Sequence, residues 1–359
     1  MIKVLQVGCG KMSKYLMRYV YEKGATIVGA VDIDNKIIGK DIGFVMDSED
    51  KNIIIQSVRR LDTIIEQEKP DIAIISTMSL LNDIRDVLRI LASKGINVIT
   101  TCEEAFFGIN SNPFTYKEID VLAKANNCTI VGSGYQDVFW GNLVSIIAGT
   151  THRIDKIKGN SSYNIEDYGL ALAEAHGAGL TLKEFSKKIA KANNISDEER
   201  QKLINDKEFL PSYMWNTIGW IADNLGLNII SMEQKSIPIT EEKDLSSDTL
   251  NMVIRKGYVT GMSALVTAET EEGITLEAEC IGKVYTETDF DINEWSILGE
   301  PDTTVTIKRP ATVELTCANI VNRIPDVINA PSGFISTSSM NPPTYKSKSL
   351  YEYLKNSLS

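Results

Sequence analysis

Two neighbouring glutamates are the residues of this sequence best suited to proton chemistry. Glu103 and Glu104 directly follow Thr100-Thr101-Cys102, at the end of an apolar run that is typical of a buried parallel strand. A carboxylate that is shielded from water can pair with a substrate cation or take a proton from an amine or from water. The same pair is also compatible with an acidic helix start that the helix dipole stabilises.

The start of the chain predicts the element that would bring a cofactor to these glutamates. An apolar strand, Lys3–Val7, runs into two glycines, Gly8 and Gly10, and an amphipathic helix follows. Gly8 permits a tight turn, Gly10 lets a pyrophosphate approach the backbone, and the helix start offers N–H groups to it. Ser13 stands where the dinucleotide fingerprint has its third glycine, and Asp32 ends the next strand, where a carboxylate receives the hydroxyls of an adenosine ribose.

The predicted cofactor contacts combine this turn with residues after the later strands and on a late helix. Ligands of a parallel sheet bind at the carboxyl ends of its strands. The side chain of Asn322 could read a cofactor amide, or it could cap or join domains. The full set is Gly8, Gly10, Lys11, Met12, Ser13, Asp32, Thr77, Thr101, Cys102 and Asn322.

The acidic end of the second strand favours NAD over NADP. Asp32 and Asp34 would repel a 2′-phosphate, and no arginine follows directly. Lys36 or Lys40 would still permit NADP. With a nicotinamide beside the glutamates, a carboxylate of raised pKa suits removal of a proton from an ammonium group before hydride leaves the same carbon.

Only one of the two glutamates should reach a substrate, because neighbouring side chains of an extended segment point in opposite directions. We expect this residue to be Glu104. Glu103 is nearer to the strand, and a second carboxylate close to the dinucleotide phosphate would be repelled. Alcohol oxidation more usually employs Lys, His or Tyr, and none of these stands at this position.

The order of elements predicts an α/β fold with a Rossmann doubly wound parallel sheet and an α+β second domain with a largely antiparallel sheet. We expect a NAD(P)-binding domain over residues 1–135, a substrate and dimerisation domain over 136–310, and a C-terminal helix and tail over 311–359 that returns to the first domain. Residues 33–52 are expected to be a loop, and the late helix is expected to end at Ile324-Pro325.

Composition excludes several classes of partner. The chain has 359 residues and a formal net charge of −11, with no basic block that would track nucleic acid or an anionic membrane. No apolar run approaches the ~20 residues of a membrane span. Five scattered cysteines and an uninterrupted first strand without a leader favour a cytoplasmic protein. With two histidines and no metal-ligand spacing, no metal site is expected.

Candidate substrate contacts come from the second domain and the segment before it. His176 stands beside two glycines, Gly177 and Gly179, that should leave it exposed, and Tyr168 precedes it. Asp137 would either cap a helix or bind a second amino group. Asn160 is a candidate from a polar strand. Most histidines in loops take no part in chemistry, so a bystander role for His176 is the alternative.

Several of these segments together resemble one enzyme family, the 2,4-diaminopentanoate dehydrogenases, which are close to the native amine dehydrogenases and share the dihydrodipicolinate reductase-like architecture. The matching segments are Val7-Gly8-Cys9-Gly10-Lys11-Met12, Thr100-Thr101-Cys102-Glu103-Glu104, Gly132-Ser133-Gly134, Glu174-Ala175-His176-Gly177-Ala178-Gly179, Val321-Asn322-Arg323-Ile324-Pro325 and Ala330-Pro331-Ser332-Gly333. Tyr135-Gln136-Asp137 departs from the Asn-Pro-Gly turn of related enzymes, which leaves the local substrate contacts open.

The resemblance implies NAD(P)-dependent oxidative deamination of 2,4-diaminopentanoate at C4, as in ornithine fermentation, giving 2-amino-4-oxopentanoate and ammonia. It also implies a homodimer built through the second-domain sheet and a catalytic glutamate within the Glu103-Glu104 pair.

Two other functions fit the same fold. A reductase of a cyclic imine or an oxo acid would need a basic cluster to hold a dicarboxylate, and no obvious one follows Tyr163. A non-catalytic NAD-binding regulator would bind the cofactor without turning it over.

Overall fold

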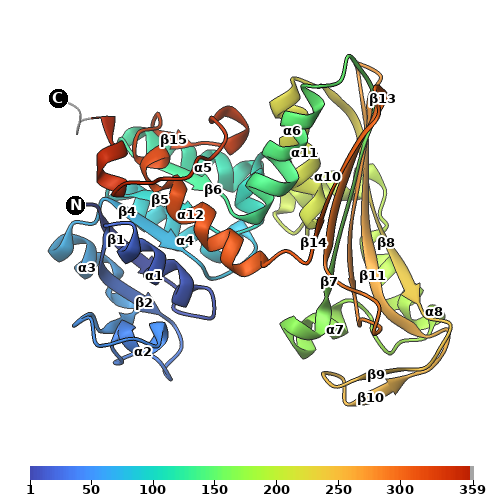
Figure 1. Cartoon of the computed structure of the whole chain (residues 1–359), viewed down its shortest axis with the longest axis horizontal. Coiled ribbons are helices and arrows are strands. Elements are labelled where there is room, and N and C mark those ends of the chain that lie inside the picture. The colour runs from blue at the N-terminus through green and yellow to red at the C-terminus, as the bar shows by residue number, and fades with distance from the viewer. Residues whose placement is uncertain (356–359) are drawn as a thin grey trace. The chain divides into compact units, whose positions relative to one another are not determined.

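The chain forms two compact units in a computed structural model that describes residues 1–355 (Figure 1). The first unit consists of Met1–Val138 together with the C-terminal stretch from Ala311, and the second consists of Phe139–Pro310. Each unit has its own sheet, and the chain passes between the units twice.

The first unit contains a seven-stranded sheet in the order β15, β6, β5, β4, β1, β2, β3, and all its strand pairs are parallel. This confirms the predicted doubly wound α/β sheet. The strands are β1 Lys3–Val7, β2 Thr26–Asp32, β3 Ile55–Ser57, β4 Ile72–Ile75, β5 Asn97–Thr100, β6 Thr129–Gly132 and β15 Gly333–Phe334. The helices are α1 Ser13–Glu22, α2 Ile42–Met46, α3 Leu61–Glu68, α4 Leu81–Ser93, α5 Pro113–Ala125 and α12 Thr312–Ile328, with the 3-10 turns η1 Val58–Arg60, η2 Glu104–Phe106, η3 Gly108–Asn110, η7 Thr337–Ser339 and η8 Leu350–Tyr353.

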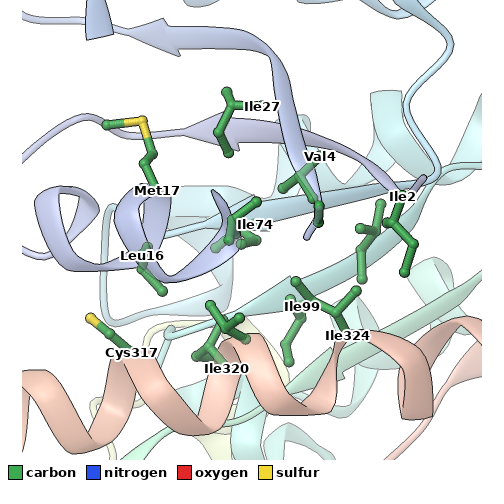
Figure 2. Packing of buried hydrophobic residues seen from close by; sticks show 14 of the residues in the cluster. Ile2, Val4, Leu16, Met17, Ile27, Ile74, Ile99, Cys317, Ile320 and Ile324 are labelled. Atoms are coloured by element: carbon green, nitrogen blue, oxygen red, sulfur yellow. The ribbon is translucent and has the colours of Figure 1, made fainter. Parts of the chain in front are cut away.

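Apolar side chains cover both faces of this sheet. On one face α1 and α12 pack against the strands through residues that include Leu16, Cys317 and Ile320, which meet Val4 and Ile74 of the sheet (Figure 2). On the other face α3, α4 and α5 form a second cluster. Burial on both faces explains why the strands read as continuous apolar runs in the sequence.

The second unit is built on a six-stranded sheet in the order β14, β13, β7, β12, β11, β8. It is mixed: β7 and β12 run parallel, and its other neighbours run antiparallel. Its strands are β7 Arg153–Asn164, β8 Ile229–Thr240, β11 Val259–Thr270, β12 Thr275–Lys283, β13 Ile292–Glu300 and β14 Thr303–Lys308, beside a hairpin of β9 Leu245–Ser247 and β10 Met252–Ile254. Its helices are α6 Leu143–Ala148, α7 Leu170–Ala175, α8 Leu182–Phe185, α9 Lys191–Asn193, α10 Asp197–Asp206 and α11 Tyr213–Leu225, with the shorter turns η5 Ile165–Tyr168 and η6 Ser186–Ala190; the π-helical turn η4, Asp137–Asn142, carries the chain into this unit.

Two expectations about the helices are wrong. Residues 33–52 are not all loop, because they contain the five-residue helix α2, whose start is capped by the Asp41 carboxylate through the Gly43 N–H. The late helix does not end at Pro325 but continues to Ile328. Proline removes one backbone N–H from the helical ladder at that position, and the helix nevertheless continues for three residues beyond it. No helix among residues 1–355 is long and apolar enough to cross a membrane.

Candidate active site

The turn after β1 has the geometry that a dinucleotide requires. Gly8 has φ +88°, and a Cβ there would stand 2.5 Å from Thr77 Cγ2 and 2.7 Å from the Ser76 carbonyl oxygen, so only glycine fits. A Cβ at Gly10 would meet nothing within 4 Å. The backbone at Gly10 is therefore open to a close approach by a phosphate.

Ser13 closes the same turn in place of the third glycine of the fingerprint. Its hydroxyl is buried and donates to the Gly10 carbonyl at 2.6 Å. Helix α1 begins here without a side-chain cap and without an acidic residue in its first turn. The positive end of its dipole is thus not neutralised by the chain itself, which suits an anion at this position.

Asp32 is held against the glycine turn, as the ribose interpretation requires. One carboxylate oxygen accepts from the Cys9 N–H at 2.6 Å, and the other accepts from Ile33 N at 2.7 Å and Asp34 N at 2.8 Å. These bonds fix the carboxylate at the end of β2, beside the turn. The turn, the start of α1 and Asp32 together fit a dinucleotide with an unphosphorylated adenosine ribose.

The two glutamates after β5 have different surroundings. Glu104 is 3% exposed, and both its carboxylate oxygens are occupied: Leu81 N donates to one at 2.7 Å and Ser111 Oγ donates to the other at 2.8 Å. Glu104 therefore binds the first N–H of α4. Its pKa is raised by burial, which outweighs the lowering by these two hydrogen bonds.

Glu103 is half-buried and is the more accessible of the pair. Burial raises the pKa of its carboxyl group, and a hydrogen bond with the Ser79 side chain opposes part of that rise. No cation among the described residues contributes to the shift of either glutamate. A carboxyl group with a raised pKa and no permanent cation can change its protonation state in use.

The turn after β6 contains a third carboxylate, with a different environment. Asp137 is fully buried and forms an ion pair with Arg323 of α12, whose Nε lies 2.9 Å and Nη2 3.1 Å from its oxygens. Ser133 Oγ donates to Asp137 at 2.8 Å, and Asn319 Nδ2 donates to it at 3.2 Å. The Asp137 carboxylate is thus compensated within the chain. The sequence gave no sign that Asp137 and Arg323 are partners, because 185 residues lie between them.

Four other predicted cofactor contacts lie in distinct places. Thr77 is exposed beside Gly8, and the half-buried Thr101 continues β5 by donating its N–H to the Ile75 carbonyl. The Cys102 side chain lies in the apolar cluster under α3 to α5, where burial holds its thiol pKa well above the usual value. Asn322 Oδ1 accepts from the Lys346 N–H of the C-terminal tail at 3.3 Å. The Cys102 side chain is thus packed in the apolar core, and the Asn322 amide oxygen binds the C-terminal tail.

The second unit brings His176 and Tyr168 together through Tyr163. The Leu172 carbonyl can only accept, so His176 Nδ1 donates to it at 2.9 Å and Nε2 accepts from the Tyr163 hydroxyl at 2.7 Å. The Tyr163 and Tyr168 rings meet edge to face, with centroids 5.5 Å apart. Tyr168 itself is 54% exposed.

The expectation that flanking glycines leave His176 exposed is wrong, since the side chain is 8% exposed and burial lowers its pKa. Gly282 of β12 explains this burial: a Cβ there would stand 2.6 Å from the imidazole ring and 2.8 Å from Tyr163. Asn160 does not join the cluster. It is an odd number of positions from Tyr163 on β7, so its side chain leaves from the opposite face of the sheet.

The parallel sheet, the glycine turn with its aspartate and the mixed-sheet second unit define the class of two-domain, Rossmann-type dehydrogenases. Solved structures of this class share the fold. A myo-inositol 2-dehydrogenase from Lactobacillus plantarum covers 91% of this chain and 88% of its own at a TM-score of 0.54 and 12% identity. An oxidoreductase from Agrobacterium radiobacter was solved in complex with NAD+, L-tartaric acid and magnesium. It covers 94% of this chain and 92% of its own at a TM-score of 0.56 and 10% identity.

The chain belongs to the 2,4-diaminopentanoate dehydrogenase family, because residues 139–352 match the model of the 2,4-diaminopentanoate dehydrogenase C-terminal domain. A solved amine dehydrogenase from Mycobacterium smegmatis is 32% identical, with a TM-score of 0.83 over 97% of this chain and 98% of that one. The curated 2,4-diaminopentanoate dehydrogenase of Acetoanaerobium sticklandii is 26% identical over 254 residues, which span 68% of this chain and 66% of the relative. The sequence-based assignment to a dehydrogenase family is thus confirmed.

Proposed function

We propose that this chain is an NAD(P)-dependent amine dehydrogenase that oxidises 2,4-diaminopentanoate at C4 to 2-amino-4-oxopentanoate and ammonia. The family match and the named amine dehydrogenase at 32% identity support the reaction class, and the relative from Acetoanaerobium sticklandii supports the substrate. An oxidised nicotinamide held at the glycine turn and Asp32 would supply the acceptor for the hydride that leaves C4. The C4 amine becomes an iminium, water adds to it, and ammonia leaves as the ketone forms.

The observation that carries this proposal is an acid–base residue of raised pKa at the correct edge of the sheet. Glu103 follows β5, the glycine turn follows β1, and only β4 lies between these two strands. Two strand spacings amount to about 10 Å, so a dinucleotide anchored at the turn can extend along this edge to Glu103. Burial keeps the pKa of Glu103 above its ordinary value, which suits proton exchange with an amine.

We assign the acid–base role to Glu103, and we assign Glu104 the task of holding the turn. Both oxygens of Glu104 accept hydrogen bonds from the chain, from Leu81 N and Ser111 Oγ. Glu103 is the more solvent-accessible of the two, and the side chain that bonds to its carboxylate is Ser79, in the exposed segment after β4. In this role Glu103 accepts a proton from the substrate ammonium group and releases it to solvent, and the regenerated carboxylate then accepts a proton from the water that attacks the iminium.

NAD is the cofactor that the end of β2 favours. The Asp32 carboxylate is fixed by three backbone N–H groups, and Asp34 lies two residues further on. A 2′-phosphate would meet both negative charges. Lys36 and Lys40 are the two lysines that could offset these charges. The ammonium group of Lys40 lies 3.8 Å from the centre of the Phe44 ring and is thus engaged in a cation–π contact.

The remaining contacts of this proposal concern the substrate and the assembly. Tyr168 and His176 are proposed to contact the substrate, with Tyr163 holding the imidazole in place. The protein is proposed to act as a cytoplasmic homodimer joined through the sheet of the second unit, which sedimentation of the purified chain would test.

The test is an assay of NADH and NADPH formation with 2,4-diaminopentanoate, a panel of simple amines and a panel of amino acids. We expect turnover with 2,4-diaminopentanoate, release of ammonia in equal amount, and a preference for NAD. Turnover only in the reverse direction with a cyclic imine or an oxo acid would support a reductase instead. Cofactor binding without turnover of any compound would support a regulator and contradict the proposal.

A further inference from the structure

A buried glutamine interrupts the apolar face of the first strand. Gln6 is fully buried in β1, and its register partners are Ala30 of β2 and Ile74 of β4. Both partners belong to the apolar cluster beneath α1 and α12, as does Val4 on the same strand. Figure 2 shows Val4 and Ile74 in this cluster. Packing alone would place another apolar residue at position 6.

The amide of Gln6 joins the glycine turn to the end of β4. Its Nε2 donates to the Gly8 carbonyl at 2.8 Å and to Ser76 Oγ at 2.9 Å, and Ser76 Oγ lies 3.2 Å from the same carbonyl, to which it donates. Since a carbonyl oxygen only accepts, the Gln6 atom that faces it must be the NH₂ group. Two donors, Gln6 Nε2 and Ser76 Oγ, thus hold the carbonyl on the inner side of the turn.

This arrangement has a cost in stability. The Gln6 Oε1 atom is buried and has no hydrogen-bond partner among the described residues. A buried polar atom without a partner destabilises a folded protein, and an apolar side chain of similar shape would avoid that loss. The glutamine therefore has a purpose other than the stability of β1.

We infer that Gln6, with Ser76, is a positioning residue for the dinucleotide: it fixes the Gly8 carbonyl inward so that the N–H groups after it stay directed to the pyrophosphate. Gly8 contacts Thr77 and Ser76 too closely for any side chain, so a small rotation of this peptide would be passed on to the open backbone at Gly10. This inference rests on the proposed function, because it assumes a bound NAD(H). It assigns Gln6 no contact with the cofactor itself.

The experiment measures NADH affinity of the purified full chain by fluorescence titration, beside the thermal midpoint without cofactor. Gln6→Met keeps the length of the side chain and removes both donors, and we expect the Kd for NADH to rise about tenfold, which corresponds to a lost hydrogen bond. Ser76→Ala should raise the Kd in the same direction. The double variant should be no worse than Gln6→Met alone, because the two residues act on one carbonyl.

Thr129→Val is the matched control. Thr129 is buried at the start of β6, where its hydroxyl donates to the Pro331 carbonyl at 2.9 Å. It lies in the same sheet but at the amino end of its strand, away from the cofactor edge. We expect this variant to lower the thermal midpoint and to leave the Kd for NADH unchanged.

A purely structural role for Gln6 would shift the midpoint in Gln6→Met and Thr129→Val alike and would leave the Kd for NADH within twofold in both, which would overturn the inference. If Gln6→Met does not fold, Ser76→Ala decides by the same criterion. Failure of the unaltered chain to bind NADH would instead contradict the proposed function, and the inference would fall with it.

Discussion

The turns after β5 and β6 are neighbours on one sheet, and each contains a buried carboxylate. They differ in whether a cation is paired with that carboxylate. After β6, Asp137 is paired with Arg323 and accepts two further hydrogen bonds. After β5, Glu104 accepts from a backbone N–H and a hydroxyl, and no cation within residues 1–355 compensates its charge. Burial therefore raises the pKa of Glu104, while the charge of Asp137 is matched inside the chain.

This difference separates the tasks of the two turns. A compensated ion pair holds a fixed arrangement, because either partner alone would be a buried, unpaired charge. The Asp137–Arg323 pair ties the end of β6 to α12, on which the chain returns from the second unit. An uncompensated carboxyl group responds to pH and to a bound cation. The turn after β5 is thus the one suited to chemistry with an ammonium substrate.

The largest expected effect on stability comes from breaking the ion pair after β6. Arg323→Met leaves the Asp137 charge buried and unpaired, and we expect the free energy of unfolding to fall by about 3–5 kcal/mol in urea titrations. Asp137→Asn combined with Arg323→Met should recover part of this loss. Arg153→Met is the control, since the Arg153–Asp155 pair is exposed and its loss should have little effect. An Arg323→Met variant as stable as the parent would contradict the claim that this ion pair fixes the turn after β6.

A smaller loss is expected from removing the Glu104 carboxylate. Glu104→Ala leaves Leu81 N at the start of α4 and the buried Ser111 hydroxyl without their acceptor. We expect unfolding in urea to require about 1–3 kcal/mol less free energy. The loss should be smaller than that of Arg323→Met, and an equal or greater loss would mean that the turn after β5 is the more rigid of the two.

The smallest expected effect is a change in how stability depends on pH. Because burial raises the folded-state pKa of Glu104 above 4.5, its contribution to stability is complete below that value and is lost as pH rises through the folded pKa. Glu104→Gln stays neutral and keeps an acceptor for Leu81 N and a partner for Ser111. Its stability should therefore fall less than that of the parent as pH rises, which urea unfolding at a series of pH values would show. Parallel curves would mean that Glu104 titrates normally.

Much of the fold could be predicted from the sequence, namely those parts in which the spacing of apolar residues along an element matches the faces that are buried in the structure. The apolar runs and the helical repeats of the first unit give its parallel sheet, since each strand there is buried on both faces. Strand β13 is harder to predict from the sequence, because its buried face carries the polar Asn293 beside Trp295 and so breaks the apolar alternation. The structure resolves this: Trp295 Nε1 donates to Asn293 Oδ1 at 3.1 Å.

The residues of the candidate site also fall into two groups, those that could be predicted from the sequence and those that could not. Gly8, Ser13 and Asp32 could be placed from the sequence, because a turn and its neighbouring strand end depend on residues close in sequence. The burial of His176 depends on Gly282, and the neutralisation of Asp137 depends on Arg323, both far along the chain. The choice between Glu103 and Glu104 likewise depends on Ser111 and α4, so alternation along one strand was insufficient to make it.

The measurement that tests the central claim most directly compares Glu103→Gln with Glu104→Gln in the deamination of 2,4-diaminopentanoate across pH, at saturating NAD. We predict that Glu103→Gln lowers kcat by about 10²–10⁴-fold, the usual contribution of a general base, and abolishes the rise of activity with pH through the raised pKa of Glu103. Glu104→Gln should retain kcat within about tenfold and keep that rise. NADH binding by both variants would show that the cofactor site is intact. Loss of turnover in Glu104→Gln with turnover retained in Glu103→Gln would contradict the account.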